Sequence, residues 1–453
     1  VLELESSAGG TSRPGAHPVT PFPWGAHYVP TPASSNRTLV RLLREMNVVT
    51  GLDDAGEPIV DEACLVPEPE ERVFWRGEWH EGLMPEAALT ADDHVQMDRF
   101  KDEVARWVRW RDGRGRRAFE LPMAASSDDA EVVSLDRQSM GEWMDERGLM
   151  SPRLRWWVDY ACRDDYGCRL DTTSAWAALF YFASRVRTAG GASQPLITWP
   201  DGNGGVVRHL ARVAGPRLRT SMLVHDLVPH EDHVQVLALD ATTRQAVQIR
   251  AEQVVLAVPR FIAGRVLRPW RDDPPSDLRE FETAPWVVAN LFLRDRPANR
   301  GFVPAWDNVF YESSSLGYVT ATHQRGRRQG PTVLTWYHAM TSGDPRGARE
   351  SLLSASREEW AEAIVTDMER AHPEITSLVE RIDMCRWGHA MVRPRPGFVW
   401  GKARRRAALP VGRVHMACTD LSGVALIEEA QYHGVRAAEE VLRERGDLGA
   451  SWI

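Results

Sequence analysis

The chain of 453 residues has no apolar run of about 18 residues, the length that a helix needs to cross a bilayer, so the sequence predicts no transmembrane segment. It is also poor in cysteine. The five cysteines are scattered, odd in number and never spaced as Cys-x-x-Cys, which is typical of reduced thiols rather than of a disulfide framework. Positive charge is not in excess either, because a net charge of -8 and an isoelectric point near 6.0 argue against a nucleic-acid partner.

The sequence also predicts no metal site. One stretch is rich in metal-ligating residue types, but these fall on a strand, a turn and a strand without the regular spacing of a ligand set. We expect a solvated hairpin and no metal there: His225, Asp226, His230, Glu231, Asp232 and His233. Two arginine-rich stretches, residues 106–117 and 402–406, are interpreted as solvated helix faces, with an anionic or membrane surface as the alternative.

What is present is most informative near the carboxyl end, in Gly412–Ala438 (GRVHMACTDLSGVALIEEAQYHGVRAA). A short β-run leads into a small-residue turn that holds Asp420, and a helix with an acidic first turn follows. The start of a helix offers free backbone N–H groups and the positive end of its dipole. This pattern therefore favours binding of an anionic or electron-rich cofactor atom.

The amino end carries a matching signal in VLELESSAGGTSRPG, an apolar run that ends in Glu5 and is followed by a Gly-Gly turn. In a dinucleotide-binding βαβ unit, an acidic residue at the tip of the second strand binds the adenosine ribose, roughly 20 residues after a glycine fingerprint. Glu5 fits that position, although no Gly-x-Gly-x-x-Gly precedes it and the chain begins with Val. Taken alone, the stretch is better interpreted as an ordinary amphipathic strand and a Gly-Gly turn.

The two ends together resemble the superfamily of FAD-dependent amine oxidases and phytoene desaturases. Inner segments follow in that superfamily's order: Pro23–Met46 is similar to its Gly-Gly-x-Tyr segment, Thr198–Gly215 to the returning loop and helix, and Gln248–Pro259 to a strand that ends in Ala-x-Pro. In this superfamily the first strand, the glycine fingerprint and the first helix lie just upstream of the position of Glu5. We therefore expect the chain to be an N-terminally truncated fragment that lacks them.

The resemblance implies an α/β fold, in which a Rossmann-like FAD-binding domain without its first βα unit carries an inserted α+β substrate domain. Residues 1–47, 198–270 and 402–453 would form the first domain, and residues 48–197 and 271–401 the second. Contacts with FAD are expected from Glu5, Gly9, Gly10, Arg13, Gly25, Ala26, His27, Tyr28, Val224, Ala257, Pro259, Trp387, Thr419, Asp420, Leu426, Ile427 and Ala430.

Local patterns predict further elements. Strands are expected at Ser221–Leu227, Val234–Asp240, Gln248–Pro259, Trp286–Leu293 and Pro331–Met340, a strand pair with an Arg-Gly turn at Glu71–Pro85, and helices at Ala177–Val186 and Ser356–Pro373.

The implied activity is two-electron oxidation of an organic substrate such as an amine by hydride transfer to flavin N5, with dioxygen or another electron acceptor. The chain departs from the amine oxidases at several places. Gly388–Gly397 has no aromatic residue, Leu426 replaces a Tyr, and Ala289 and Asn290 stand where a Lys is common. The cysteine that attaches flavin in some relatives is absent, so FAD is expected to be held non-covalently. The alternatives are a flavin-dependent C–C desaturase or isomerase of a lipid-like substrate, and a redox-silent FAD-fold binding protein.

Catalytic candidates are few. In Tyr160–Gly167 (YACRDDYG), Asp165 and Tyr166 are candidate catalytic residues. Adjacent Asp164 and Asp165 point about 100° apart on a helix, so one is expected to line the pocket while the other pairs with Arg163 or Arg169. An acidic, solvated helix end is the alternative. His389 is the other polar candidate. Flavin-lining or core positions are expected for His27, Tyr28, Trp336 and Tyr337. The sequence leaves open the substrate, the oligomeric state and the compartment, which is the cytoplasm by default unless an export signal precedes the chain.

Overall fold

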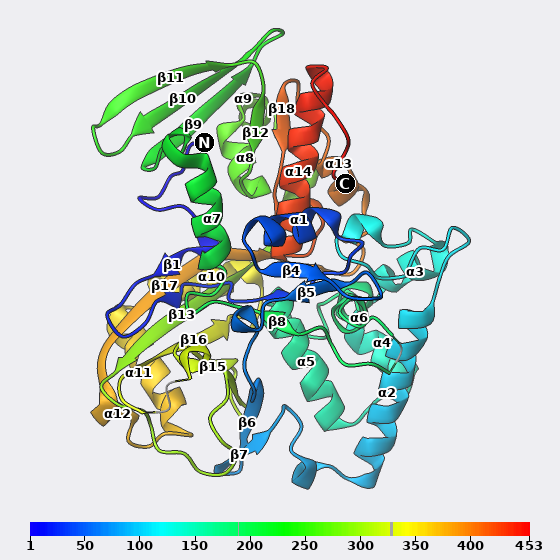
Figure 1. The fold of residues 1–453 in the computed structure, drawn as a ribbon, viewed down its shortest axis with the longest axis vertical. Helices are drawn as coiled ribbons and strands as arrows, with labels where there is room; N and C mark the ends of the chain where they lie inside the picture. Colours follow the sequence, from blue (N-terminus) through cyan, green and yellow to red (C-terminus); the bar gives the residue numbers. More distant parts are fainter. Residues whose placement is uncertain (189, 327–328) are drawn as a thin grey trace.

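The computed structural model describes residues 1–188, 190–326 and 329–453, and these form a mixed α/β fold. Figure 1 shows a large sheet and a group of helices side by side in its lower half, with a second, smaller set of strands and helices above them. Within the described residues, no helix is long and apolar enough to cross a membrane.

The large sheet has the strand order β17-β13-β16-β15-β14-β6-β7, and every described pair is antiparallel except β14 with β6. Its strands are β6 (Glu71–Trp75), β7 (Glu78–Glu81), β13 (Thr283–Leu293), β14 (Asp307–Phe310), β15 (Gly317–Thr320), β16 (Thr332–Ala339) and β17 (Val379–Val392). This arrangement confirms the strands expected at Trp286–Leu293 and Pro331–Met340, and the strand pair with its Arg-Gly turn at Glu71–Pro85.

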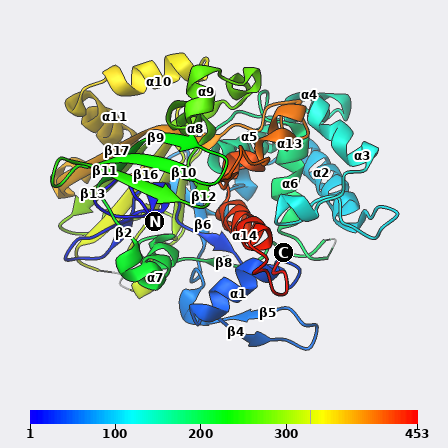
Figure 2. The same cartoon turned by 90° about the horizontal axis from the view of Figure 1, so that it is seen from above.

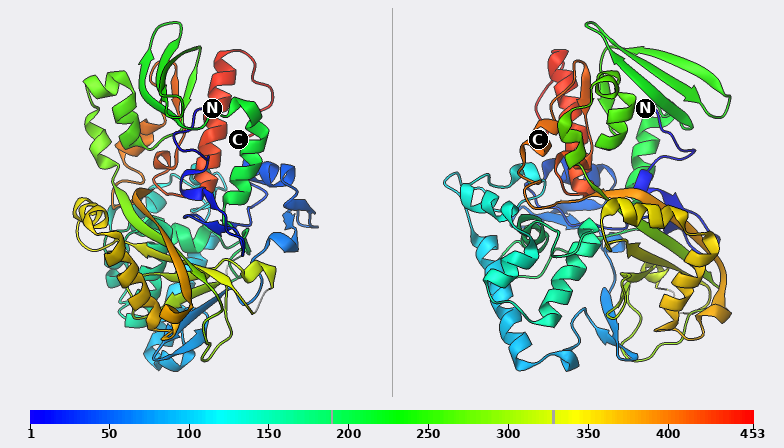
Figure 3. Two further views of the ribbon diagram at one scale, coloured as in Figure 1. Left: turned by 90° about the vertical axis from the view of Figure 1, so that its left-hand side faces the viewer. Right: turned by 180° about the vertical axis from the view of Figure 1, so that it is seen from behind.

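Strand β13 is buried along its whole length because helices cover both faces of this sheet. Alternate residues Val287, Ala289 and Leu291 pack with α10 (Pro345–Ser354), α11 (Arg357–Glu369) and α12 (Ile375–Leu378), which lie on the outer face in Figure 3. The opposite face, with Trp286 and Val288, packs towards α5 (Pro152–Tyr166). The helix expected at Ser356–Pro373 is confirmed as α11, which Ser356 caps together with Glu359.

The neighbouring helices are α2 (Ala91–Arg109), α3 (Ala130–Ser134), α4 (Met140–Glu146), α5 and α6 (Ala175–Ser184). They pack around an aromatic core that contains Phe100, Trp143, Tyr166 and Trp176. Helix α6 confirms the helical prediction at Ala177–Val186, and its ten residues are almost wholly apolar because it lies inside this group.

The upper part holds a three-stranded antiparallel sheet of β9 (Met222–Pro229), β10 (Val234–Asp240) and β11 (Gln245–Ala251), and a parallel pair of β12 (Val254–Leu256) with β18 (Val414–Met416). The prediction of a single strand over Gln248–Pro259 is wrong. The chain turns at residues 252–253, since β11 pairs antiparallel with β10 whereas β12 joins β18 in another sheet.

Helices α7 (Gly204–Ala214), α8 (Arg260–Val266), α9 (Arg268–Asp272), α13 (Lys402–Ala407) and α14 (Ile427–Glu444) surround these strands, and α1 (Arg37–Glu45) packs beside α14 in Figure 2. Short strands complete the described fold: β1 (Pro14–Gly15), β2 (Phe22–Pro23), β3 (Val29–Pro30), β4 (Val49–Leu52), β5 (Pro58–Val60) and β8 (Leu196–Ile197).

The acidic and histidine-rich stretch does form the β9–β10 hairpin. Asp226 is not solvated as expected, because it is 3 % exposed and forms ion pairs with Arg268 and Arg271. Among the described residues, no group of three His, Cys, Asp or Glu side chains is placed to hold a metal ion.

Candidate active site

One cavity, with an empty volume of about 830 Å³, lies where the upper part meets the sheet and the helices. Distant segments meet at its walls: residues 25–28, the end of α5, Arg185 after α6, strands β13, β16 and β17, and the start of α14.

Several predicted positions meet at this cavity. Its walls include Gly25, Ala26, His27, Tyr28, Asp165, Trp387, Leu426 and Ile427, joined by Asp164 and Glu428. A Cβ at Gly25 would lie 2.4 Å from the carbonyl oxygen of Thr11, so glycine lets this segment pack closely against residues 9–13.

His389 does not line the cavity. Its side chain is exposed, Nδ1 lies 2.6 Å from Thr283 Oγ1, and its ring stacks on Phe261 with centroids 3.9 Å apart. The pairing of β17 with β13 shifts between Trp387 and Met391, and this bulge turns Trp387, Ala390 and Met391 to the cavity and His389 away from it.

Tyr166 also lies outside the cavity. It is fully buried among the helices, where its hydroxyl donates to the carbonyl oxygen of Ala177 at 2.8 Å. Trp336 and Tyr337 are adjacent on β16. Tyr337 lines the cavity, whereas Trp336 faces the other side of the sheet and donates from Nε1 to Asp367. Successive residues of a strand point to opposite faces, so both could not line one site.

The remaining predicted positions form two groups away from the cavity. In the first, Glu5 is exposed, its carboxylate lies 3.9 Å from Arg13, and its carbonyl oxygen accepts from the N–H of Ser221, just before the strand of Val224. Gly9 and Gly10 both have a positive φ. In the second, buried Asp420 accepts from the N–H of Arg260 at 2.8 Å, which joins Thr419–Leu421 to the turn of Ala257 and Pro259. Ala430 is exposed on α14.

Asp165 is held by a closed set of contacts. Arg185 Nη2 lies 3.1 and 2.9 Å from its two oxygens, and the hydroxyl of Tyr28 donates to Oδ1 at 3.0 Å. The expected partners were wrong, because Arg163 and Arg169 pair with Asp159. Burial is the largest single contribution and lowers the pKa of Arg185, but the surrounding charges, of which Asp165 contributes most, together raise this pKa well above its usual value.

Asp164 and Asp165 both line the cavity. Unlike Asp165, Asp164 forms no ion pair with the described residues. Burial, reinforced by Asp165 and Asp307, raises the pKa of Asp164 well above its usual value. An acidic, solvated helix end is therefore not what the structure contains at this point.

The two glutamates at the start of α14 are placed differently. Glu429 accepts hydrogen bonds from the backbone N–H of Met123 at 2.6 Å and from the hydroxyl of Ser422. Glu428 lines the cavity, is 2 % exposed, and has one carboxylate oxygen without a partner among the described residues. Burial raises the pKa of each to about 7.

Aromatic side chains form much of the remaining wall. The rings of His27 and Tyr337 stack with centroids 4.8 Å apart, and Tyr28, Trp286 and Trp387 complete the aromatic surface. Burial lowers the pKa of His27 to about 4, so this imidazole is neutral near pH 7. These aromatic residues lie outside Gly388–Gly397: Trp387 directly precedes that stretch, and the others come from residues 27–28, β13 and β16.

The start of α14 fits an electron-rich cofactor atom. Leu426 precedes the helix and gives no side-chain cap, and Ala425, Leu426 and Ile427 all line the cavity, so the start of α14 faces this space. Sequence reasoning missed Arg185 as a site residue. A single charge directly after the apolar helix α6 was the available signal.

Comparisons with known proteins show that this mixed α/β chain is an oxidoreductase. Residues 23–442 match the family described as flavin containing amine oxidoreductase. The chain belongs to this family and is a flavin-dependent oxidoreductase. No match was found among the curated proteins.

Solved structures with the same fold share little sequence with the chain. Putrescine oxidase bound to putrescine has a TM-score of 0.69 at 15 % identity, over 98 % of this chain and 93 % of the other. Cyclohexylamine oxidase from Brevibacterium oxydans IH-35A has 0.64 at 14 % identity, over 97 % and 93 %. A fatty acid isomerase from P. acnes that produces CLA has 0.65 at 16 % identity, over 98 % and 91 %.

Proposed function

We propose that the protein binds FAD non-covalently and oxidises an amine in the cavity beside Asp164. The observation that carries this proposal is the meeting of the start of α14, aromatic walls and an unpaired carboxylate around one space. Residues 1–47, 198–270 and 402–453 would form the FAD-binding part, and residues 48–197 and 271–401 the substrate-binding part.

The start of α14 would hold the electron-rich edge of the flavin, and Glu5 with Arg13 would lie at the adenosine end. When bound, FAD accepts a hydride equivalent from the substrate and passes the electrons to dioxygen or another acceptor. No cysteine lines the cavity in the described part of the chain, which supports non-covalent binding.

The surrounding residues suit an amine. Asp164 offers a carboxylate without a counterion, the aromatic faces of Tyr337 and Trp387 attract a cation, and neutral His27 adds no opposing charge. Asp165 is neutralised by Arg185 and fixes the hydroxyl of Tyr28 at the wall. A fatty-acid-like substrate is disfavoured, since its carboxylate would face Asp164 and Glu428.

The experiment begins with the purified holoprotein. Flavin absorbance should be present, and acid precipitation should release the flavin into the supernatant. Under anaerobic conditions, alkyl amines should bleach the flavin absorbance, whereas fatty acids of the same length should not. With oxygen readmitted, peroxide release identifies an oxidase. Bleaching by fatty acids alone would overturn the amine assignment, and a flavin that no tested substrate reduces would support a redox-silent protein.

A further inference from the structure

A second cavity lies directly beside the active-site cavity. It has an empty volume of about 300 Å³, and both spaces are lined by Pro30, Arg185 and Glu428. The rest of its wall comes from the segment before α1, from residues 120–121 and from the segment that begins at the end of α6. Glu428 therefore borders the space proposed for the substrate on one side and the second cavity on the other.

Buried polar atoms without partners line the second cavity. Within the described residues, no hydrogen bond reaches Asn36 Nδ2, Ser184 Oγ, Arg187 Nε or Glu428 Oε1. Asn36 and Glu428 are each 2 % exposed, and Ser184 is 6 % exposed. Because buried polar groups are nearly always hydrogen-bonded, four of them on one wall indicate a small polar molecule that contacts them.

The mixture of these atoms points to water as that molecule. Asn36 and Arg187 offer N–H donors. Glu428 offers an acceptor, and the hydroxyl of Ser184 can donate and accept. An anion would meet the carboxylate of Glu428 and a cation would meet the guanidinium of Arg187, whereas water both donates and accepts and commonly binds such buried groups.

The second cavity also extends towards the surface of the molecule. Thr31, Arg187 and Gln194 line it, and each of them is partly exposed. The N–H of Gln194 donates to the carbonyl oxygen of Arg185 at 2.8 Å, which ties this outer wall to the wall that the two cavities share. Water in the second cavity would therefore connect Glu428 with solvent.

Amine oxidation needs such a connection. An ammonium nitrogen has no free electron pair, so it must lose a proton before its α-carbon can give up a hydride equivalent. Asp164 and Glu428 line the active-site cavity and form no ion pair with the described residues. Asp164 borders only this cavity, whereas Glu428 borders both, so a proton on Glu428 can leave without passing the substrate.

The charges around Glu428 allow it to accept and to release a proton. Burial raises its pKa to about 7, Arg185 opposes this shift and Asp165 adds to it. A carboxyl group with a pKa near the working pH suits both directions of transfer. The other charged side chains around it are Asp164, Glu120 and Arg187 on the cavity walls and Glu429, which follows on α14.

We propose that Glu428 accepts the proton that the bound ammonium group loses and passes it to water in the second cavity, through which the proton reaches solvent. The N–H bond of the substrate breaks as an O–H bond forms on the carboxylate, and this O–H bond breaks when water takes the proton. No electrons are transferred in either step. The inference rests on the proposed amine oxidation. It makes Glu428 a catalytic residue and Ser184 a positioning residue for the water.

The first test measures anaerobic flavin reduction by octylamine in the holoenzyme over a range of pH. Glu428→Gln should lower the rate about a hundredfold and remove the rise with pH near 7 that loss of its proton causes. Ser184→Val and Ala33→Val place apolar methyl groups in the second cavity. Each should slow reduction about tenfold with the affinity for octylamine unchanged, since neither residue lines the active-site cavity. Ser354→Val, an exposed position that also ends a helix, is the matched control.

An unchanged pH profile in Glu428→Gln would overturn the role of Glu428, and unchanged rates in both valine variants of the cavity would overturn the path. A second measurement needs no turnover. Tert-octylamine has no α-hydrogen to lose, so it can occupy the active-site cavity without being oxidised. In D₂O, the infrared carboxyl band that Glu428→Gln removes should then still exchange rapidly, and slow exchange would overturn the path even if the valine variants fail to fold. If no amine reduces the flavin but exchange is rapid and Ser184→Val slows it, the proton path stands and amine oxidation fails.

Discussion

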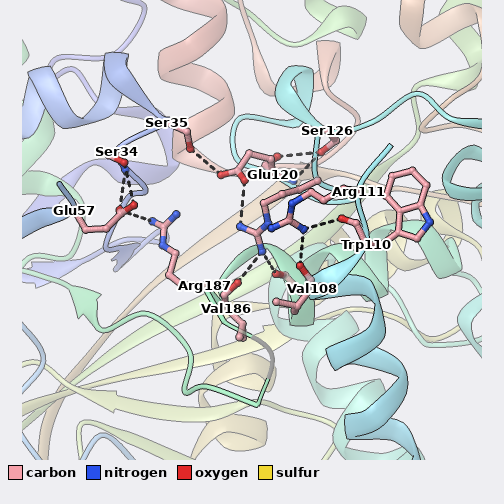
Figure 4. A network of polar contacts seen from close by, with 12 residues as sticks. Ser34, Ser35, Glu57, Val108, Trp110, Arg111, Glu120, Ser126, Val186 and Arg187 are labelled. Carbon is pink, nitrogen blue, oxygen red and sulfur yellow. Dashed lines mark hydrogen bonds and ion pairs between the residues drawn. The ribbon is translucent and has the colours of Figure 1, made fainter. Parts of the chain in front are cut away.

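Two groups of charged residues in this fold behave differently. Around Glu120, shown in Figure 4, the charges are paired: the carboxylate accepts from Ser35 at 3.0 Å and from Arg117 at 3.1 Å, and Arg117 also donates to the carbonyl oxygen of Val186 at 2.7 Å. Around the cavity, Asp164 and one oxygen of Glu428 have no such partners among the described residues.

The comparison separates charges that hold the fold from charges that await a ligand. A paired buried charge fixes neighbouring segments, and in Figure 4 Arg187 and Glu57, 3.8 Å apart, extend the contacts towards Ser34. An unpaired buried carboxylate costs stability and persists where function requires it. The variants below test whether each charge belongs to the group assigned to it.

Breaking a pair at the cavity should have the largest effect. Arg185→Ala leaves Asp165 buried without its partner, which is expected to cost about 3 to 5 kcal/mol of unfolding free energy. Urea denaturation measures the loss. Arg346→Ala is the control, because its pair with Glu350 is exposed and contributes about 0.3 to 0.5 kcal/mol. Equal losses in the two variants would show that Asp165 does not depend on Arg185.

Removing an unpaired charge should raise the unfolding free energy, and the gain should depend on pH. Glu428 has a pKa of about 7 in the folded chain and 4.5 as its ordinary value. As the pH rises between these values, the unfolded chain releases the proton first, so the folded state loses about 3 kcal/mol. Glu428→Gln should therefore be more stable than the unaltered protein at about pH 8 and similar at about pH 4. Denaturation at both pH values measures this, and a pH-independent difference would contradict it.

Asp164→Asn should reduce activity without loss of stability. The substitution removes the carboxylate expected to bind the ammonium group, so kcat/KM for amines should fall about ten- to a hundredfold. Unfolding free energy should stay constant or rise, because no ion pair is broken. If stability falls while kcat/KM is retained, Asp164 belongs with the paired, structural charges.

Glu120→Gln tests the other side of the comparison with a smaller effect. The amide keeps an acceptor for Ser35 but removes the charge that faces Arg117, which should cost about 1 to 2 kcal/mol of stability. Flavin content and the kcat/KM for amines should not change, because Glu120 does not line the cavity. A loss of activity without a loss of stability would show that the contacts of Glu120 belong to the active site.

Sequence reasoning predicted strands and helices well where a single pattern dominates, as in fully buried β13 and capped α11. It also expected residues 25–28 and 426–427 at one site from the order of segments in the superfamily, and both groups line the cavity. It could not place His389, because a bulge in β17 decides which way that side chain points. It could not find the pair of Asp165 with Arg185 either, since Asp165 lies on α5 and Arg185 directly after α6, and the two meet only in the packed fold.

The smallest effect, and the sharpest comparison, concerns the two glutamates at the start of α14. Glu428 lines the cavity, whereas Glu429 is bound by Met123 and Ser422. Negative charge that develops on a flavin near this helix would be opposed by Glu428, so Glu428→Gln should raise the flavin midpoint potential. Glu429→Gln should move the potential less and lower stability, because a neutral amide is a weaker acceptor for the N–H of Met123. Spectroelectrochemical titration of both variants gives the comparison. Equal shifts in potential would mean that the two side chains lie equally near the ring, and no shift in either would place the flavin away from α14.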